Sequence, residues 1–267
     1  MLHSKIFNAA LATSVALLGL SATSQSAQAY SFDVLQDRNG DQVFNDADYN
    51  LYAQGAGHLF TTKAVVESRI GNNKSERGVW ESGIFNSAYN ATGTQYTNTM
   101  NTATQLGQQW TSGKAEDFTL KYTGSELIYT IAGQTTRQAF TGGLTDMLLR
   151  TRAAGGSSVT LSGLRLMDSL GNLKASYAQQ GSAASTGAAS DIDYLKVSGL
   201  KDGFTLTGQT AFSWTGTRPN NSNLALQWKI GSTPEPIQKK VPEPASLLGL
   251  GLVGTAIAHR RKRAKVA

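Results

Sequence analysis

The sequence predicts an all-β protein: an antiparallel β-sandwich of the jelly-roll type, flanked by an N-terminal signal helix and a short C-terminal transmembrane helix. Only 16% of the 267 residues are charged, 28 are glycine, and Ser, Thr, Asn and Gln supply most of the polarity. That composition is typical of many short strands joined by tight turns. Apolar and polar residues alternate through much of the centre, which is the period of a strand with one solvated face. No P-loop, GxGxxG motif or long amphipathic helical pattern competes with this interpretation.

The clearest alternation lies in residues 116–140. Phe118, Leu120 and Tyr122 alternate with polar residues, and a Thr-Gly turn separates them from a second alternating run at 127–131. A third short segment follows the next glycine-containing turn, so this region predicts three consecutive antiparallel strands. Further strands are predicted at 62–70, 78–85, 145–153, 157–168, 191–200, 203–214 and 223–230. Two stretches lack this periodicity and are predicted to be irregular: 86–109, and the low-complexity linker at 181–190.

The chain is long enough for one domain with a substantial core between its targeting segments. It has no cysteine, so disulfides, cysteine nucleophiles and thiolate metal sites are all excluded. The predicted divisions are a signal peptide at 1–29, an N-terminal segment at 30–58, a sandwich domain at 59–231, a linker at 232–240 and a sorting segment at 241–267.

The N-terminus has the features of a secretory signal peptide. Lys5 gives it a basic start, an apolar stretch follows at about 9–20, and the segment closes with Ala27-Gln28-Ala29. Small residues in an A-x-A pattern form a cleavage site, so the mature chain is predicted to begin at Tyr30 after cleavage by signal peptidase. An uncleaved N-terminal anchor is the alternative.

The C-terminus combines a short apolar run with a basic tail. Residues 245–258 carry no charge, and as a helix they would span about 21 Å, against a bilayer core of about 30 Å. The run is therefore suited to transient residence in the inner membrane. The tail that follows is expected to stay on the cytoplasmic side. It contains Arg260, Arg261, Lys262 and Arg263.

Before the apolar run stands Val241-Pro242-Glu243-Pro244. The two prolines cannot continue a helix upstream, so this motif is expected to be extended just outside the membrane. The order of motif, Gly/Leu-rich helix and arginine-rich tail resembles a PEP-CTERM sorting signal. The resemblance implies cleavage by an exosortase near the motif and delivery to the cell surface, outer envelope or extracellular matrix. An ordinary tail anchor is the alternative.

The middle of the chain, over roughly 60–230, is similar to the choice-of-anchor W domain. The similarity includes Ser68 to Gly71, Gly78 to Glu81, Trp110, Phe118 to Gly124, Asp146 to Arg152 and Ser157 to Leu161. It implies a bacterial surface protein and supplies no catalytic residues.

The working part of the chain is predicted to be electrically neutral. The net charge of +6 comes from 24 Lys and Arg against 18 Asp and Glu. One of those cations is Lys5 and five follow Ala258, which leaves 18 cations against 18 acids in residues 30–244. The high isoelectric point therefore describes the targeting segments, and no nucleic-acid partner is predicted.

One local motif is typical of calcium loops. Its oxygen-bearing residues follow the spacing 1, 3, 5, 9 and 12 of an EF-hand or dockerin-type loop, in the order Asp37, Asn39, Asp41, Asn45 and Asp48. Position 6 is usually glycine, because the loop turns sharply there, but here it is Gln42. Calcium is accordingly the one cofactor considered, with an ordinary polar surface loop as the alternative.

Catalytic motifs are weak. His58 is the one histidine outside the targeting segments, and Glu116 and Asp117 adjoin, so on a strand they would point to opposite faces. Trp110 is the tryptophan most expected to be exposed, since it precedes a Thr-Ser-Gly turn. The favoured hypothesis is a non-catalytic surface or matrix protein. A carbohydrate-binding module that contacts extracellular polysaccharide and a secreted hydrolase are the alternatives.

Overall fold

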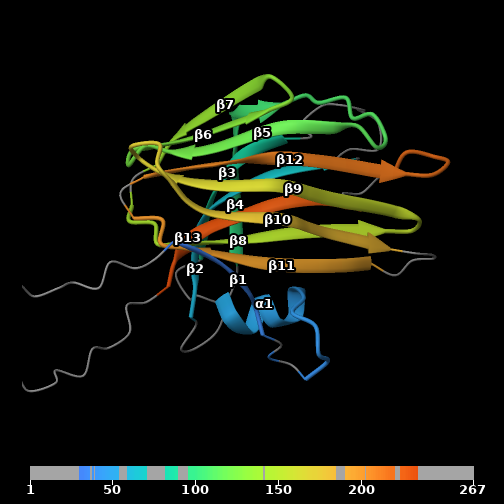
Figure 1. Ribbon diagram of the computed structural model, residues 1–267, viewed down its shortest axis with the longest axis horizontal. Coiled ribbons are helices and arrows are strands. Elements are labelled where there is room, and N and C mark those ends of the chain that lie inside the picture. Colours follow the sequence, from blue (N-terminus) through green and yellow to red (C-terminus); the bar gives the residue numbers. More distant parts are fainter. Residues whose placement is uncertain are drawn as a thin grey trace, which may run out of the picture.

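Two antiparallel β-sheets pack face to face in the computed structural model of the chain (Figure 1). The structure describes residues 30–36, 38, 40–53, 59–70, 82–89, 96–140, 142–184, 190–201, 203–219 and 223–233, with the backbone alone described in 86–89 and 96–105. The all-β class and the two antiparallel layers predicted from the sequence are confirmed. No helix within these described residues is long and apolar enough to cross a membrane. The predicted signal helix and the predicted C-terminal transmembrane helix lie outside them.

The strands divide into a seven-stranded and a six-stranded sheet, with the orders β1-β11-β8-β13-β2-β3-β4 and β10-β9-β12-β5-β6-β7. The seven-stranded sheet contains β1 (Ser31–Val34), β11 (Ser190–Ser198), β8 (Asp146–Ala154), β13 (Leu224–Ser232), β2 (Thr61–Ile70), β3 (Ser82–Tyr89) and β4 (Tyr96–Leu106). The six-stranded sheet contains β10 (Leu173–Ala184), β9 (Ser157–Asp168), β12 (Phe204–Trp214), β5 (Ala115–Tyr122), β6 (Glu126–Ile131) and β7 (Gln134–Ala139). One helix, α1 (Asp46–Ala53), is described.

Most strands lie where the apolar alternation predicts them. The region 116–140 forms β5, β6 and β7 as three neighbours in one sheet, and β6 alternates buried and half-buried residues along its whole length. One predicted strand begins later than expected, because β3 starts at Ser82 and residues 78–81 lie outside the described part of the chain.

Two stretches predicted to be irregular contain strands at 86–89, 96–106 and 181–184, so those predictions are wrong there, while 90–95 and 185–189 lie outside the described residues. The region 86–109 contains the end of β3 and all of β4, and β10 runs from Leu173 through Ala184 into the predicted linker. Both β4 and β10 are edge strands. An edge strand is paired on one side only, and packing context decides strand formation more than intrinsic propensity does. Polar sequences can therefore form such strands without an apolar alternation.

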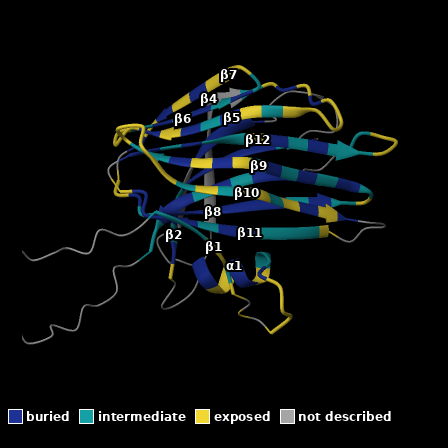
Figure 2. Cartoon of the chain, in the orientation of Figure 1, coloured by how far each residue is buried: buried dark blue, intermediate teal, exposed yellow. Residues whose placement is uncertain are grey.

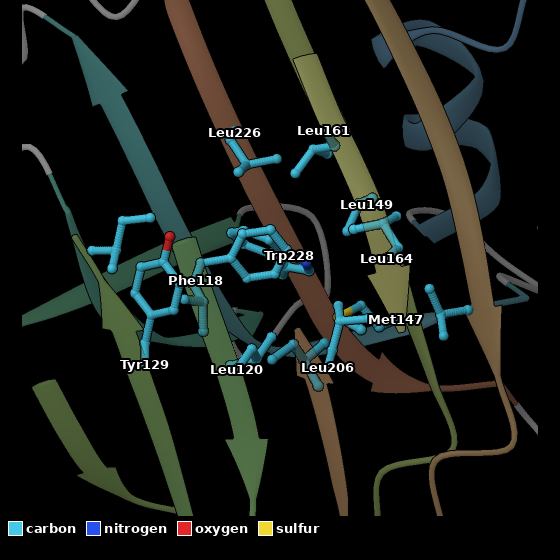
Figure 3. Packing of buried hydrophobic residues seen from close by; sticks show 14 of the residues in the cluster. Phe118, Leu120, Tyr129, Met147, Leu149, Leu161, Leu164, Leu206, Leu226 and Trp228 are labelled. Carbon is cyan, nitrogen blue, oxygen red and sulfur yellow. The ribbon is translucent and has the colours of Figure 1, made fainter. Parts of the chain in front are cut away.

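The core between the sheets is built on large side chains that meet across the layers (Figure 3). Trp228 of β13 is fully buried, and its ring lies 5.0 Å from that of Phe118 and 5.5 Å from that of Tyr129, centroid to centroid. The Tyr129 hydroxyl is hydrogen-bonded to Ser68 Oγ of β2 at 2.8 Å. Burial raises the pKa of Tyr129 strongly, so this hydroxyl stays protonated and links the two sheets.

The outer faces of the two sheets differ, and along the strands of the six-stranded sheet buried residues are interspersed with half-buried and exposed ones (Figure 2). The helix α1 packs on the outer face of the seven-stranded sheet, where Tyr49 and Tyr52 join Leu148 and Tyr194 in a second buried cluster. The outer face of the six-stranded sheet carries exposed and half-buried polar residues, and Figure 1 shows no described element over it. Among the described residues, a helix covers one outer face and no element covers the other.

Candidate functional site

The loop with calcium-like spacing leads directly into α1, and the structure describes three of its five candidate ligands. Asp37 and Asn39 lie outside the described residues. Gln42 takes a φ of 73°, which is the left-handed backbone conformation for which glycine is usually needed at position 6. The turn that this substitution put in question is therefore present.

Asn45 and Asp48 cap the first turn of α1 reciprocally. Asn45 Oδ1 accepts a hydrogen bond from the Ala47 N–H at 2.7 Å, and Asp48 Oδ2 accepts one from the Asn45 N–H at 3.0 Å. This arrangement is a variant of the capping box in which the N-cap side chain accepts from the N2 rather than the N3 N–H, and it satisfies backbone donors that a helix start leaves unpaired. Asp48 Oδ1 also accepts from the Arg38 N–H at 2.7 Å. The capping explains why an acid stands at position 48 whether or not a metal binds.

Asp41 is the third described candidate. Its carboxylate accepts hydrogen bonds from the Val43 N–H at 3.0 Å and from Asn45 Nδ2 at 2.7 Å. Among the described residues, no group of three or more His, Cys, Asp or Glu side chains is arranged to hold a metal ion. Calcium binding by this loop stays a prediction.

A charged clamp fixes α1 to the sheet below it; we use this name for Asp46, Arg150 and Tyr194. Both carboxylate oxygens of Asp46 accept from the Arg150 guanidinium, at 2.7 and 2.5 Å, and Oδ1 also accepts from the Tyr194 hydroxyl at 2.7 Å. Burial alone would raise the pKa of Asp46, but the hydrogen bonds and charge of Arg150 hold that pKa below its ordinary value. The clamp is therefore an ion pair at neutral pH.

The clamp continues as a row of polar side chains across the outer face of the sheet. Arg150, Gln227 and Glu67 lie directly opposite one another on β8, β13 and β2. Gln227 Nε2 donates to Glu67 Oε2 at 2.7 Å, and Glu67 Oε1 pairs with Arg69 at 2.9 Å. Buried charges need partners of this kind to offset the loss of hydration.

Lys229 lies beside this row, between the sheet and α1. Its ammonium stands 3.5 Å from the centroid of the Tyr49 ring and 5.9 Å from that of Tyr194, so it makes a cation–π contact. Burial, together with the charge of Arg150, lowers the pKa of Lys229 to about 7, against the raising effect of Asp46 and Glu67. A perturbed lysine can mark a functional site, but structural networks of charge give the same shift.

Both ends of the described domain leave the sandwich together. Ser31 of β1 lies opposite Ser198, and Ser198 in turn lies opposite Asp146. Asp146 lies opposite Gly231, near the end of β13. The start of β1 and the end of β13 therefore lie at the same end of the seven-stranded sheet, in one row of residues that face each other on neighbouring strands.

The last described residue, Thr233, is tied down at this end. Its N–H donates to Thr145 Oγ1 at 3.1 Å and to Asp146 Oδ2 at 3.2 Å, and its hydroxyl also donates to Asp146. Lys196 pairs with the other oxygen of Asp146 at 3.3 Å. Burial would raise the pKa of Asp146, but these partners lower it. A buried ionised acid thus anchors the chain where it enters the predicted linker.

The remaining candidates form no catalytic group among the described residues. Glu116 pairs with Lys114 at 2.6 Å, while Asp117 accepts from Gln209 on the outer face at 2.9 Å. His58 lies outside the described residues. Trp110, the sequence's candidate for an exposed ring, is buried: it is 7% exposed and its Nε1–H donates to the Arg69 carbonyl.

The residues predicted for targeting lie outside the described part of the chain, at both ends. They are Ala27 and Ala29 of the signal cleavage site, Val241, Pro242, Glu243 and Pro244 of the sorting motif, and Arg260, Arg261, Lys262 and Arg263 of the basic tail. Tyr30, the predicted first residue of the mature chain, immediately precedes β1.

Comparison with protein-family models matches residues 240–262 to the PEP-CTERM protein-sorting motif. A search of curated proteins finds no match to the chain. The similarity to the choice-of-anchor W domain is not confirmed. The matched segment includes the four residues singled out from the sequence, the apolar run and the start of the basic tail. The chain therefore carries, next to an all-β domain, the sorting signal of an exosortase substrate that is exported and sorted to the cell surface.

Proposed function

We propose that the protein is a non-catalytic component of the cell surface or extracellular matrix, whose β-sandwich is displayed after an exosortase cleaves the chain near Val241–Pro244. The single observation that carries this proposal is the sorting motif at 240–262. Signal peptidase and the exosortase would be its processing partners, and the inner membrane its transient location.

The placement of the chain ends supports display. Thr233 is anchored to Asp146, and the sorting motif begins eight residues later, at Val241. An extended chain covers at most about 3.5 Å per residue, so this spacer reaches no more than about 28 Å. While the motif is held by its processing enzyme, the β1 and β13 end of the sandwich must stay near the membrane. The opposite end, with the β8–β9 turn at Gly155 and Gly156, then faces outwards.

The sequence offers a matched test of the motif. Pro234-Glu235-Pro236 repeats the triplet of Pro242-Glu243-Pro244 eight residues earlier, outside the matched segment. The double variant Pro242→Ala/Pro244→Ala should accumulate uncleaved in the inner membrane. The control Pro234→Ala/Pro236→Ala should mature normally, because it loses the same residues without touching the signal.

Cell fractionation and intact-mass measurement would separate these outcomes. Normal maturation of the Pro242/Pro244 variant would contradict processing at this motif. A failure of both variants alike would show that spacer stiffness, rather than the motif, controls sorting.

Carbohydrate binding is a second candidate function, and one feature favours it. A row of threonines crosses the uncovered face of the six-stranded sheet: Thr135, Thr130, Thr119 and Thr207 lie directly opposite one another on β7, β6, β5 and β12. Neighbouring strands lie about 4.8 Å apart, so the hydroxyls form a regular polar array. Such an array suits the hydroxyl groups of a neutral polysaccharide.

A glycan array with the mature protein tests this candidate. Thr119→Val/Thr207→Val removes two hydroxyls while keeping the side-chain shape, and should weaken binding to any neutral glycan that the protein retains. Thr111→Val, an exposed residue of the turn before β5, is the control. Equal binding by all three proteins, or no binding at all, would reject the threonine row as a glycan site.

A further inference from the structure

The edge strand β10 has an unusually long unpaired side. It pairs with β9 at a constant register from Ala175, opposite Leu166, to Ala184, opposite Ser157, with one gap in the ladder at Ala178. No described strand pairs with it on the other side, since β10 ends the sheet order. Apart from the ladder with β9, the described structure gives no backbone hydrogen bond to residues 175–182. This stretch therefore presents a row of free backbone donors and acceptors.

Two usual protections of an edge strand, charge and proline, are missing along this stretch. Residues 175–184 contain no charged residue and no proline; the one register shift lies before them, between Leu173 and Ala175, and the pairing with β9 is interrupted only at Ala178. The nearest cation, Lys174, is already paired with Asp168 at 2.9 Å. Natural proteins normally block a free edge with charge, proline, a bulge or a short strand.

The other edges for which side chains are described are protected. At the far side of the same sheet, β7 is six residues long and carries Arg137. The edge strand β1 of the other sheet is only four residues long and includes Asp33. The contrast shows that β10 is the open edge of the six-stranded sheet.

A depression adjoins the free edge. It has a volume of about 470 Å³ and is lined by Ser158 to Thr160 of β9, Gln179 to Ala183 of β10, and Asp193. In recognition by strand addition, backbone hydrogen bonds supply affinity and pockets beside the edge receive alternate side chains. The β10 edge therefore has both features that strand addition uses, a free backbone edge and a depression beside it.

We propose that β10 is a self-association edge, on which the β10 strand of a second copy of this chain pairs in antiparallel orientation. Residues 175–182 are uncharged, so pairing the stretch with itself brings no like charges together. An antiparallel pair of identical strands is also isologous, which closes a dimer rather than an open fibre. Asp191 limits the pairing to residues before 183, because its carboxylate already accepts the Ala183 N–H at 2.7 Å.

The association is expected to be weak in dilute solution. Stable interfaces bury roughly 1,600 Å², more than one short strand pair supplies. It would become effective where copies are concentrated by sorting to one surface. The edge is formed by the sandwich itself, so the inference does not depend on the proposed display function.

The absence of cysteine from the chain allows a direct test by disulfide trapping. Gln179→Cys and Ala178→Cys, each in the full-length gene, place one thiol at the middle of the free stretch. Thr135→Cys on β7, exposed at the opposite edge of the same sheet, is the matched control. A disulfide needs Cα atoms within about 7 Å, so paired β10 strands should cross-link at residue 178 or 179 at least tenfold faster than the control when intact cells are oxidised.

A second variant separates pairing from chance collision. Adding Ser176→Lys and Gln180→Lys to Gln179→Cys puts like charges along both copies and should reduce cross-linking at least tenfold, with an unchanged unfolding temperature as evidence of folding. Sedimentation of purified wild-type protein over a concentration series should show a dimer that these lysines remove. Equal cross-linking at residues 135, 178 and 179, or a monomer at every concentration, would overturn the proposal.

Discussion

At the scale of single residues, Lys229 is the most unusual group in the described structure. It is a lysine whose ammonium stands over the Tyr49 ring and beside the cation Arg150. Its pKa near 7 means that burial and repulsion outweigh the attraction of Asp46, Glu67 and the Tyr49 ring. The residue therefore costs stability in its charged form, although its contacts look favourable one by one.

The lowered pKa of Lys229 makes the free energy of unfolding depend on pH. In the unfolded chain Lys229 has an ordinary pKa of 10.5, so between about pH 7 and 10.5 the unfolded state binds more protons. Stability contributed by this residue must rise with pH through that window. Lys229→Met should abolish the rise and raise the free energy of unfolding by about 1–3 kcal/mol at pH 7. Denaturant unfolding at pH 6.5 and 9.5 measures both effects.

Lys121 provides the control for that experiment. It is an exposed lysine on the outer face of β5, so Lys121→Met should change the free energy of unfolding by less than about 0.5 kcal/mol at either pH. A Lys229→Met protein with the pH profile of the wild type would show that the ammonium is not buried in solution.

At the scale of the element, α1 depends on the sheet more than on its own sequence. It has eight residues, too few to be stable alone in water. The capping box of Asn45 and Asp48 fixes where it starts, and the charged clamp fixes how it lies.

The clamp can be tested as a pair. Asp46→Ala leaves the Arg150 guanidinium, which is 6% exposed, without its carboxylate and should destabilise the protein by about 1–3 kcal/mol. The expected loss extends down to about 1 kcal/mol because solvent screens the partly exposed Asp46 carboxylate. Asp46→Ala/Arg150→Met should recover most of the loss, because no buried charge is left unpaired. Thermal unfolding of the wild type, both single variants and the double variant measures the coupling energy, and strictly additive effects would contradict the clamp.

The loop before α1 carries the calcium prediction. Titration of the mature protein with millimolar calcium in a calorimeter should give a saturable heat, since extracellular calcium modules bind in the 10⁻⁴ to 10⁻³ M range. Asp41→Ala should remove the heat, whereas Asp33→Ala, an exposed acid outside the loop, should not. An absence of heat from the wild-type protein would leave Asn45 and Asp48 with their capping role alone.

At the scale of the whole molecule, the sandwich has an attached end and a free end. The attached end is defined by β1, by β13 and by the buried Asp146 between them. The mature protein recovered from cells should begin at Tyr30 and end near Pro244. Its intact mass measures both cleavages at once and would reveal any group attached to the new C-terminus. An unprocessed chain in the cytoplasm would contradict the targeting predictions at both ends.

The core strands were predictable because burial imposes a pattern that is readable in one chain. Phe118, Leu120 and Tyr122 must alternate with polar residues to reach the core from a strand with one wet face. The sequences of β4 and β10 lack such an apolar alternation, which is why these two edge strands were missed. The helix was missed as well, since eight residues with mixed polarity give almost no helical periodicity.

The targeting signals were found from the sequence alone, because other proteins recognise them as linear patterns, and a comparison with family models confirmed the C-terminal signal. The contacts on the outer faces of the sheets could not be predicted from linear sequence patterns. Tertiary structure alone brings Asp46 to Arg150 and Lys229 to Tyr49, and it alone leaves one side of β10 without a described partner strand. Those contacts join residues that lie far apart in the chain, and they follow from sheet order and register, which local periodicity does not specify.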